Sequence, residues 1–303
     1  MTVSRVKLSP QGPEFSRFIA GFWRAMSWQK SPQDLLAFIE QNVELGVTTM
    51  DHADIYSDGE CEKAFGAAIK LQPGLRDKIE IVSKCGIKPA FDTRPERYVN
   101  HYDTSKEHII ASAEQSLLNL EVESLDMLLI HRPDPLMDAE QVAAAFSLLQ
   151  QQGKVKHFGV SNFTNSQFEL LQSACEMPLL TNQIEISPVN ISALHDGSLD
   201  YCQQHKVSAM AWSCLAGGEI FTGESEQAQR LREVLIKVAA EIGAANIDQV
   251  IYAWILALPA QVLPIIGSGR IERTRSTVAT EALQLDRQQW FSIWQASTGH
   301  SVP

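Results

Sequence analysis

The chain has 303 residues, of which 45% are hydrophobic and 20% are charged, and this is the composition of an ordinary globular protein. Its 25 basic and 36 acidic residues give a net charge of −11, which argues against nucleic acid or an anionic membrane surface as a partner. The five cysteines are dispersed, and the sequence shows neither a signal-peptide pattern nor an uninterrupted apolar stretch of the roughly 20 residues that a membrane span needs. We therefore expect a cytoplasmic protein with free thiols.

Short apolar strands alternate with amphipathic helices along the chain. In chain order, we expect a hairpin within residues 3–16 and then eight strands, at residues 15–23, 46–51, 78–85, 125–131, 156–161, 179–186, 207–213 and 262–267. Capping residues such as Ser31 and Asp138 indicate helices between them, at residues 31–46, 104–120, 138–154 and 165–175. A final helix is predicted at about residues 286–296.

The alternation of strands and helices predicts an α/β fold with a parallel sheet. Eight such units in about 300 residues match a single (β/α)8 TIM barrel domain over residues 1–303, with the N-terminal hairpin closing the barrel bottom and an extra C-terminal helix. No G-x-G-x-x-G follows an early strand, which argues against a Rossmann fold.

Polar side chains stand at the carboxyl ends of several predicted strands. Asp51, Lys84 and His131 end or follow three strands in succession, and Tyr56 lies just after the first of them. In a (β/α)8 barrel these strand ends surround one mouth, where active sites lie. The four side chains are therefore expected to be neighbours in space.

This set of groups can protonate an oxygen that gains negative charge. A free phenol has a pKa of about 10, and an ammonium group beside it favours phenolate and lowers that pKa. Tyr56 with Lys84 and Asp51 would then be a tuned general acid, and His131 would donate a second hydrogen bond to the same oxygen. A carbonyl that receives hydride is one reaction partner that needs this.

Each of these residues also has a plainer interpretation. Asp51 could serve only as a helix cap, and Tyr56 only as a packing residue at the rim. Lys84 could extend its charged head to solvent, and His131 could be a hydrogen-bonded loop residue. Their joint placement at successive strand ends is what favours the catalytic interpretation.

Several motifs, in order, resemble those of the aldo-keto reductase family, and the resemblance covers nearly the whole chain. They are "DHADIY" at 51–56, "IVSKCG" at 81–86, "LDMLLIHRPDP" at 125–135 and "GKVKHFGVSNF" at 153–163. The longer pattern, with "AWSCLAGG" at 211–218 and "PIIGSGRIERTRSTV" at 264–278, is most similar to the bacterial YdhF-like oxidoreductases. The resemblance implies a tyrosine acid, Tyr56, with Lys84, Asp51 and His131 as its partners.

The resemblance also implies a nicotinamide cofactor. Hydrogen bonds to the carboxamide fall on Ser161, Asn162 and Gln183, and stacking under the ring falls on Trp212. Further cofactor contacts are expected at Trp23 and, beside the pyrophosphate, at Ser213, Leu215, Gly217 and Gly218.

The segment "GSGRIERTR" concentrates positive charge on an acidic protein. Gly267, Ser268 and Gly269 lead into a helix N-terminus that favours phosphate. Arg270, Arg273 and Arg275 suit a ribose 2′-phosphate and hence NADPH, unless they only form a solvated helix face. Ser276 and Thr277 stand where many relatives carry Glu-Asn to contact adenine, so adenine recognition is expected to use other residues.

The sequence thus predicts an NADPH-dependent reductase of aldehydes or ketones. No metal is expected, because His52 and Asp54 should point to the opposite face from Asp51 and no paired ligand motif supports a metal site. Two other functions stay open. One is a lyase that uses Lys84 to form a Schiff base, and the other is a non-catalytic NADPH-binding redox sensor or regulatory subunit.

Aromatic residues and one methionine in the loops after the first and third strands indicate a small substrate that is apolar or aromatic. They are Phe22, Trp23, Met26, Trp28, Phe91 and Tyr98. Nothing in the sequence demands more than a monomer or a weak homo-oligomer.

Overall fold

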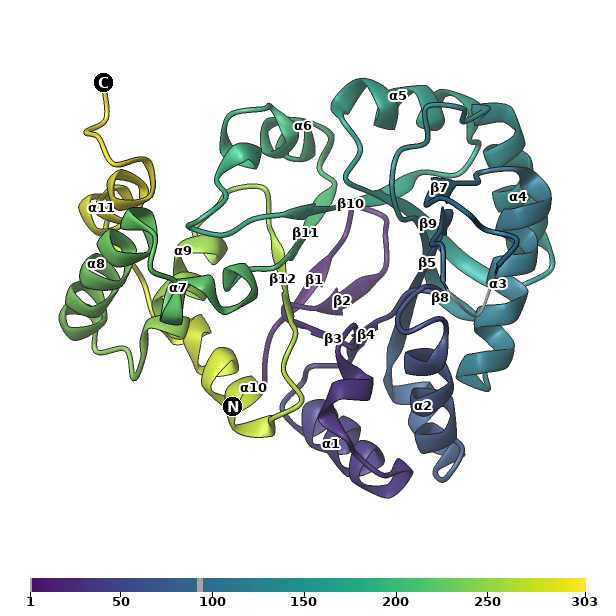
Figure 1. The fold of residues 1–303 in the computed structure, drawn as a ribbon, viewed down its shortest axis with the longest axis horizontal. Helices are drawn as coiled ribbons and strands as arrows, with labels where there is room; N and C mark the ends of the chain where they lie inside the picture. Colours follow the sequence, from purple (N-terminus) through teal and green to yellow (C-terminus); the bar gives the residue numbers. More distant parts are fainter. Residues whose placement is uncertain (1, 92–94) are drawn as a thin grey trace.

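Eight parallel strands close into a barrel at the centre of the molecule (Figure 1). The computed structural model describes residues 2–91 and 95–303, so residues 92–94 of the predicted substrate loop lie outside the described part. In chain order the barrel strands are β3 (Ile19–Gly21), β4 (Thr49–Asp51), β5 (Glu80–Cys85), β8 (Leu125–Ile130), β9 (Val155–Ser161), β10 (Leu179–Glu185), β11 (Ser208–Trp212) and β12 (Leu263–Ile266). β12 pairs with β3 and closes the ring, which confirms the predicted (β/α)8 fold.

Helices surround the barrel (Figure 1). The helices that alternate with the strands are α1 (Pro32–Glu44), α2 (Glu60–Ile69), α3 (Lys106–Leu120), α4 (Ala139–Gln151), α5 (Asn165–Ala174), α6 (Ser198–His205), α9 (Ile247–Leu256) and α10 (Ile271–Val278). α7 (Glu219–Thr222) and α8 (Glu226–Ile242) extend the segment after β11, and α8 packs against the C-terminal helix α11 (Arg287–Thr298). Among the residues described, no helix is both long and apolar enough to cross a membrane.

Shorter elements shape the loops. The 3-10 helices are η1 (Ala25–Trp28), η2 (Pro73–Lys78), η3 (Ser192–Leu194), η4 (Ala216–Gly218) and η5 (Ala279–Ala282), and a two-stranded ribbon joins β6 (Ile87–Lys88) to β7 (His101–Tyr102). The predicted caps are in place. Ser31 accepts a hydrogen bond from the Asp34 backbone, and Asp138 caps α4 in the same way.

The first predicted strand, residues 15–23, is wrong as a single element. It is divided into β2 (Glu14–Ser16), which pairs with β1 (Arg5–Lys7) in an antiparallel hairpin, and β3 of the barrel. Ser16 marks the division, because its hydroxyl accepts the backbone N–H groups of Thr48 and Thr49 at 3.2 and 3.0 Å and donates to the Phe18 carbonyl. A side chain thus takes over the role of the sheet ladder at this point.

The hairpin closes the bottom of the barrel, as predicted. Leu8 and Phe15 of the hairpin join an apolar cluster with residues of six barrel strands, among them Val82, Met127 and Met210. A second, larger cluster fills the space between the sheet and the helices. The barrel is therefore a packed core below its mouth.

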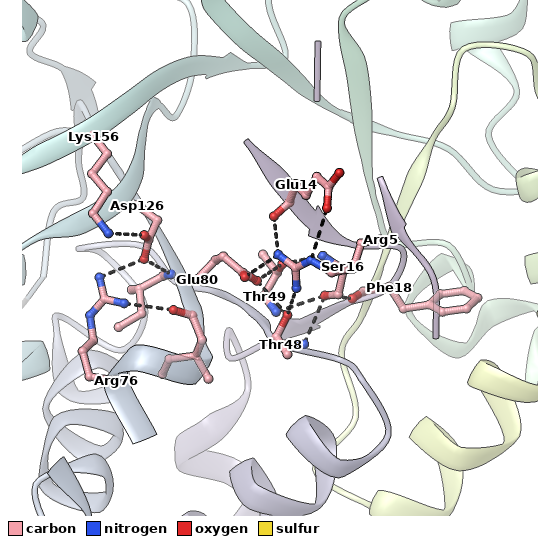
Figure 2. A network of polar contacts seen from close by, with 12 residues as sticks. Arg5, Glu14, Ser16, Phe18, Thr48, Thr49, Arg76, Glu80, Asp126 and Lys156 are labelled. Carbon is pink, nitrogen blue, oxygen red and sulfur yellow. Dashed lines mark hydrogen bonds and ion pairs between the residues drawn. The ribbon is translucent and has the colours of Figure 1, made fainter. Parts of the chain in front are cut away.

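A polar network ties the hairpin to the amino ends of the strands (Figure 2). The Glu80 carboxylate accepts from Arg5 at 2.6 Å and from the hydroxyls of Thr48 and Thr49 at 2.7 and 2.9 Å. Next to it, Asp126 accepts from Arg76 and from Lys156, both at 2.8 Å. These contacts lie at the end of the barrel opposite the mouth, so they bear on stability and not on chemistry.

We expect Glu80→Gln to lower the free energy of unfolding by about 1–3 kcal/mol, because the charge-assisted bond to Arg5 is lost. Thermal unfolding should show a fall in Tm of roughly 2–6 °C with the specific activity unchanged. Glu121→Gln is the matched control, because its pair with Lys70 is solvent-exposed and should contribute less than about 1 kcal/mol. Equal losses in the two variants would contradict this view of the network.

Candidate active site

A lysine, an aspartate and a tyrosine meet at the mouth of the barrel. The Lys84 ammonium donates to Asp51 Oδ2 at 2.8 Å, to Tyr56 Oη at 3.0 Å and to the His52 carbonyl oxygen at 2.7 Å. Lys84 is fully buried, and Asp51 is 3% exposed. An ammonium group has three hydrogens, so every donor of this buried charge is satisfied.

The strands explain why these side chains converge. Asp51 is the last residue of β4 and lies opposite Val82 of β5. Val82 belongs to the apolar cluster inside the barrel, and Lys84 comes two residues later on the same strand. Since side chains alternate along a strand, Lys84 points to the same side as Val82, just above the packed interior.

The Tyr56 phenol keeps its proton more firmly than the sequence predicted. Burial is the largest influence and raises the pKa of Tyr56, the Lys84 charge lowers it, and the Asp51 charge raises it again. Lys84 thus acts in the predicted direction, but burial outweighs it and the net pKa of Tyr56 is raised. Burial also lowers the pKa of Lys84, but Asp51 and Tyr56 outweigh it and the pKa of the ammonium rises.

His131 follows β8 and faces Tyr56. The two ring centroids are 6.0 Å apart and the rings are nearly perpendicular, at 77°. Burial, helped by the charges of Lys84 and Arg132, lowers the pKa of His131 well below its ordinary value. The imidazole is therefore neutral at physiological pH and has one N–H to donate. Its buried Nδ1 has no hydrogen-bond partner in the described residues.

Gln183 joins this site in a way that the sequence did not predict. Its side-chain amide donates to Asp51 Oδ1 at 2.9 Å, from a strand on the far side of the barrel. Alternation along β10 could have indicated that Gln183 points inward, but a contact between residues 132 positions apart leaves no local signal. Both carboxylate oxygens of Asp51 are thus occupied.

The other residues expected to hold the carboxamide form a chain of hydrogen bonds. Ser161 Oγ donates to the Gln183 carbonyl oxygen at 2.8 Å, and Asn162 Nδ2 donates to Ser161 Oγ at 2.7 Å. The Trp212 indole N–H then donates to Asn162 Oδ1 at 3.1 Å. The structure therefore connects the expected ring-stacking residue to Gln183 through Asn162 and Ser161, and the Gln183 side chain continues the connection to Asp51.

The loop after β11 has space for a close approach. Ser213, Ala216, Gly217 and Gly218 all have positive φ, and a Cβ on Gly218 would meet no atom within 4 Å. Leu215 is partly buried in the same loop. The backbone N–H groups of Ala216 and Gly218 already donate to the Ser213 and Leu215 carbonyl oxygens, at 2.7 and 2.9 Å, so what this loop offers a ligand is the open space beside Gly218.

The loop after β3 lies close to the loop after β11. Trp23 is 58% exposed, and the Arg24 guanidinium carbon lies 5.0 Å from the centroid of its ring. A Cβ added at Gly217 would lie 3.9 Å from Nη2 of Arg24. Trp23 and Gly217 thus belong to neighbouring parts of the mouth.

The residues predicted to bind phosphate lie between β12 and α10, and the structure gives them different roles. A Cβ on Gly267 would meet nothing within 4 Å, whereas one on Gly269 would lie 2.4 Å from the Trp28 indole. Gly269 is therefore required by packing against Trp28. Ser268 Oγ accepts from the Arg270 backbone, and the side chains of Arg270 and Arg273 are exposed around the start of α10.

Four other residues lie apart from the mouth or have other partners. His52 stacks on Phe22, with ring centroids 4.6 Å apart, and burial lowers its pKa to about 3. The prediction of Phe22 as a substrate wall is wrong, because Phe22 is fully buried among aromatic residues between the sheet and α1 and α2. Thr277 is buried, and Ser276 Oγ accepts from Asn246.

Asp54 is partly buried beside α3 and not at the mouth. Its Oδ2 accepts from the Ser112 hydroxyl at 2.7 Å, while its Oδ1 has no partner in the part of the chain described. Burial raises the pKa of Asp54 to about 7. In the described residues, no three potential metal-ligating side chains come together.

Comparisons with known proteins agree with this geometry. Residues 17–297 match the model of the Aldo/keto reductase family. The chain is 58% identical to oxidoreductase YdhF of Escherichia coli over 99% of this chain and 100% of the relative, and 41% identical to a 6-dehydroglucose reductase of Agrobacterium fabrum with the same coverage. The fold is also that of an aldo/keto reductase from Klebsiella pneumoniae, solved in complex with NADP and acetate, with a TM-score of 0.76 and 24% identity over 98% and 97% of the two chains.

Asp54 makes stability depend on pH. An unfolded Asp has a pKa of about 3.9, so the folded protein binds the extra proton between about pH 4 and pH 7. Its stabilising contribution is complete below pH 4 and is lost as the pH rises through 7. We expect Asp54→Asn to be more stable than the wild type by about 2–4 kcal/mol at pH 8, relative to their difference at pH 4.

Thermal unfolding of the two proteins from pH 4 to pH 8 measures this difference directly. His52 titrates with the opposite sign in an overlapping range, but it is present in both proteins and cancels. A difference in Tm that does not change with pH would contradict the raised pKa of Asp54.

Proposed function

The chain belongs to the aldo/keto reductase family of oxidoreductases, and from this premise we propose that it reduces aldehydes or ketones to alcohols with NADPH. The observation that carries the proposal is the contact of the Lys84 ammonium with both Asp51 and Tyr56 beside a neutral His131. We extend the proposal to a single-domain, cytoplasmic protein that acts as a monomer or a weak homo-oligomer.

The residues at the mouth fit a nicotinamide dinucleotide, which when bound would supply a hydride. Trp212 offers a flat indole for stacking, while Ser161, Asn162 and Gln183 bring amide and hydroxyl groups close to it. The space over Gly218 and Gly267 leaves room for the phosphates. Trp23 and Leu215 would cover the same region.

In this mechanism Tyr56 is the proton donor. Its raised pKa keeps the phenol protonated at neutral pH, so the proton is available when the carbonyl oxygen gains negative charge. The phenolate that remains is stabilised by the Lys84 ammonium at 3.0 Å. The neutral imidazole of His131 donates a hydrogen bond to the same oxygen and orients the carbonyl.

Asp51 and Gln183 hold the lysine in place. Asp51 keeps Lys84 charged in its buried position, and Gln183 fixes the second oxygen of that carboxylate. The role that we propose for Gln183 thus includes positioning of Asp51, in addition to the predicted contact with the cofactor. A Schiff-base lyase is less consistent with this arrangement, because a charged, fully hydrogen-bonded ammonium is a poor nucleophile.

Two classes of carbonyl substrate have support. Exposed apolar residues on the loops after β3, β5 and β8, such as Met26, Tyr98 and Leu136, favour an apolar or aromatic compound. Relatives 41% and 30% identical to this chain are named 6-dehydroglucose reductases, which favours an oxidised sugar. A panel of aromatic aldehydes and sugar aldehydes, assayed by NADPH oxidation, distinguishes the two.

Tyr56→Phe removes the proton donor and keeps the ring. Lys84 retains its bonds to Asp51 and to the His52 carbonyl, so the fold and NADPH binding should persist. We expect turnover to fall by at least about 10²–10⁴-fold, with the Kd for NADPH changed less than about threefold. Turnover retained in Tyr56→Phe would contradict the mechanism. If the wild type binds NADPH but reduces no carbonyl compound of the panel, the redox-sensor alternative is favoured.

Arg270 and Arg273 should select NADPH over NADH. Loss of charge-assisted bonds to a 2′-phosphate corresponds to about 10–100-fold in affinity. We expect the Arg270→Met, Arg273→Met double variant to raise KM for NADPH by this factor and to leave KM for NADH unchanged. Arg287→Met, which removes an exposed charge at the start of α11, is the control. An equal rise for both cofactors would place the phosphate elsewhere.

A further inference from the structure

Arg132 follows His131 directly at the mouth of the barrel. Its side chain is partly buried, and its guanidinium carbon lies 5.5 Å from the centroid of the Trp212 ring. Its charge contributes to the lowered pKa of His131, so it acts at short range on that imidazole. Arg132 therefore lies between the residue that would orient the carbonyl and the residue that would stack on the nicotinamide.

The guanidinium of Arg132 has no hydrogen bond or ion pair within residues 2–91 and 95–303. Other partly buried arginines differ. Arg76 binds Asp126 and two carbonyl oxygens, and Arg232 binds the Gly223 and Ile220 carbonyl oxygens. A guanidinium has five donors, so the partly buried Arg132 keeps donors that an anionic ligand could use.

The carboxylates on neighbouring segments already have partners. Asp134, two residues along the same loop, accepts from the Thr104 hydroxyl and from the Leu136 backbone at 2.8 Å each. Glu185, which lies opposite Trp212 in the strand register, accepts from Asn190 at 2.9 Å. In a protein with a net charge of −11, Arg132 is thus a cation at the mouth for which residues 2–91 and 95–303 supply no hydrogen-bond acceptor.

We propose that Arg132 binds an anionic group, a carboxylate or a phosphate, on the far side of the substrate from the reacting carbonyl. This inference rests on the proposed reductase function and deepens it: the substrate class is an acidic aldehyde or ketone. A planar guanidinium suits such a group because it can donate two parallel hydrogen bonds. Since Arg132 is adjacent to His131, the anion also fixes the carbonyl against the imidazole and Tyr56.

The exposed apolar residues of the rim agree with this class. Tyr98 and Leu136 are each 90% exposed and offer contacts to the body of a substrate whose charged end is held by Arg132. A benzaldehyde with a carboxylate opposite the aldehyde combines both properties. An oxidised sugar with a phosphate combines the anion with hydroxyl groups instead.

Two matched substrate pairs test the proposal. The first is 4-carboxybenzaldehyde and its methyl ester, and the second is glyceraldehyde 3-phosphate and glyceraldehyde. We expect the wild type to show a kcat/KM at least about tenfold higher for the charged member of one pair, which tells a carboxylate from a phosphate. Arg132→Met should lose about 10–100-fold on that member, mainly through KM, and less than about threefold on its neutral counterpart.

Two further variants sharpen the result. Arg132→Lys keeps the charge without the paired donors and should fall between the wild type and Arg132→Met. Arg287→Met removes one exposed charge at the start of α11 and should leave the ratio of kcat/KM for the charged and the neutral substrate unchanged. The proposal would be overturned if Arg132→Met lost the same factor in kcat/KM on charged and neutral substrates, or if the wild type did not prefer the charged substrate. It would also be overturned if Arg132→Met bound NADPH with a tenfold weaker Kd, because Arg132 would then belong to the cofactor site.

A binding measurement separates this inference from the reductase function. If no carbonyl of the panel is reduced, the proposed function fails, and benzoate and inorganic phosphate are then titrated into the NADP-bound protein with tryptophan fluorescence as the readout. Binding of either anion that is about tenfold tighter to the wild type than to Arg132→Met supports an anion site at Arg132. Equal affinity, or no binding to either protein, overturns it.

Discussion

The buried ammonium of Lys84 is the group on which the rest of the site depends. A charge held out of water is tolerated only when it is paired and fully hydrogen-bonded. Here the three hydrogens go to Asp51, to Tyr56 and to the His52 carbonyl, at 2.7–3.0 Å. The same geometry that makes the buried charge tolerable also fixes the phenol, so the folding of the barrel mouth and the placement of the Tyr56 hydroxyl are one requirement.

This requirement extends across the barrel. Gln183 holds the other oxygen of Asp51, and its own backbone accepts from Ser161, which is bound by Asn162 and through it by Trp212. The residues proposed for proton transfer and those proposed for the cofactor therefore share one connected set of hydrogen bonds. Since partners in such a network are not independent, substitutions at Gln183 and Asp51 are expected to be non-additive.

The sequence predicted the barrel well because its strands are short apolar runs, and several runs end in polar residues whose position in the fold follows from the parallel topology. It also placed Asp51, Lys84 and Tyr56 in one region for that reason. It could not predict what depends on burial or on contacts across the barrel. The raised pKa of Tyr56, the bond from Gln183 to Asp51 and the packing of Trp28 on Gly269 all arise only when distant segments meet. The division of the first strand at Ser16 depends in the same way on β4.

The charges at the mouth also explain how an acidic protein could favour a reaction that generates negative charge. Burial and then the charges of Lys84 and Arg132 lower the pKa of His131, so the imidazole is neutral and the positive charge near it is carried by Lys84 and Arg132. An oxygen that becomes negative between Tyr56 and His131 would be stabilised by a fixed positive field without competing for the proton of the imidazole. If Arg132 also binds the acidic end of the substrate, its charge would be partly neutralised before the reaction, and Lys84 would then be the principal source of that field. The site can bind an anion and stabilise the reacting oxygen because its two cations are held by different strands. Lys84 is buried beside the phenol, and Arg132 is accessible to a ligand.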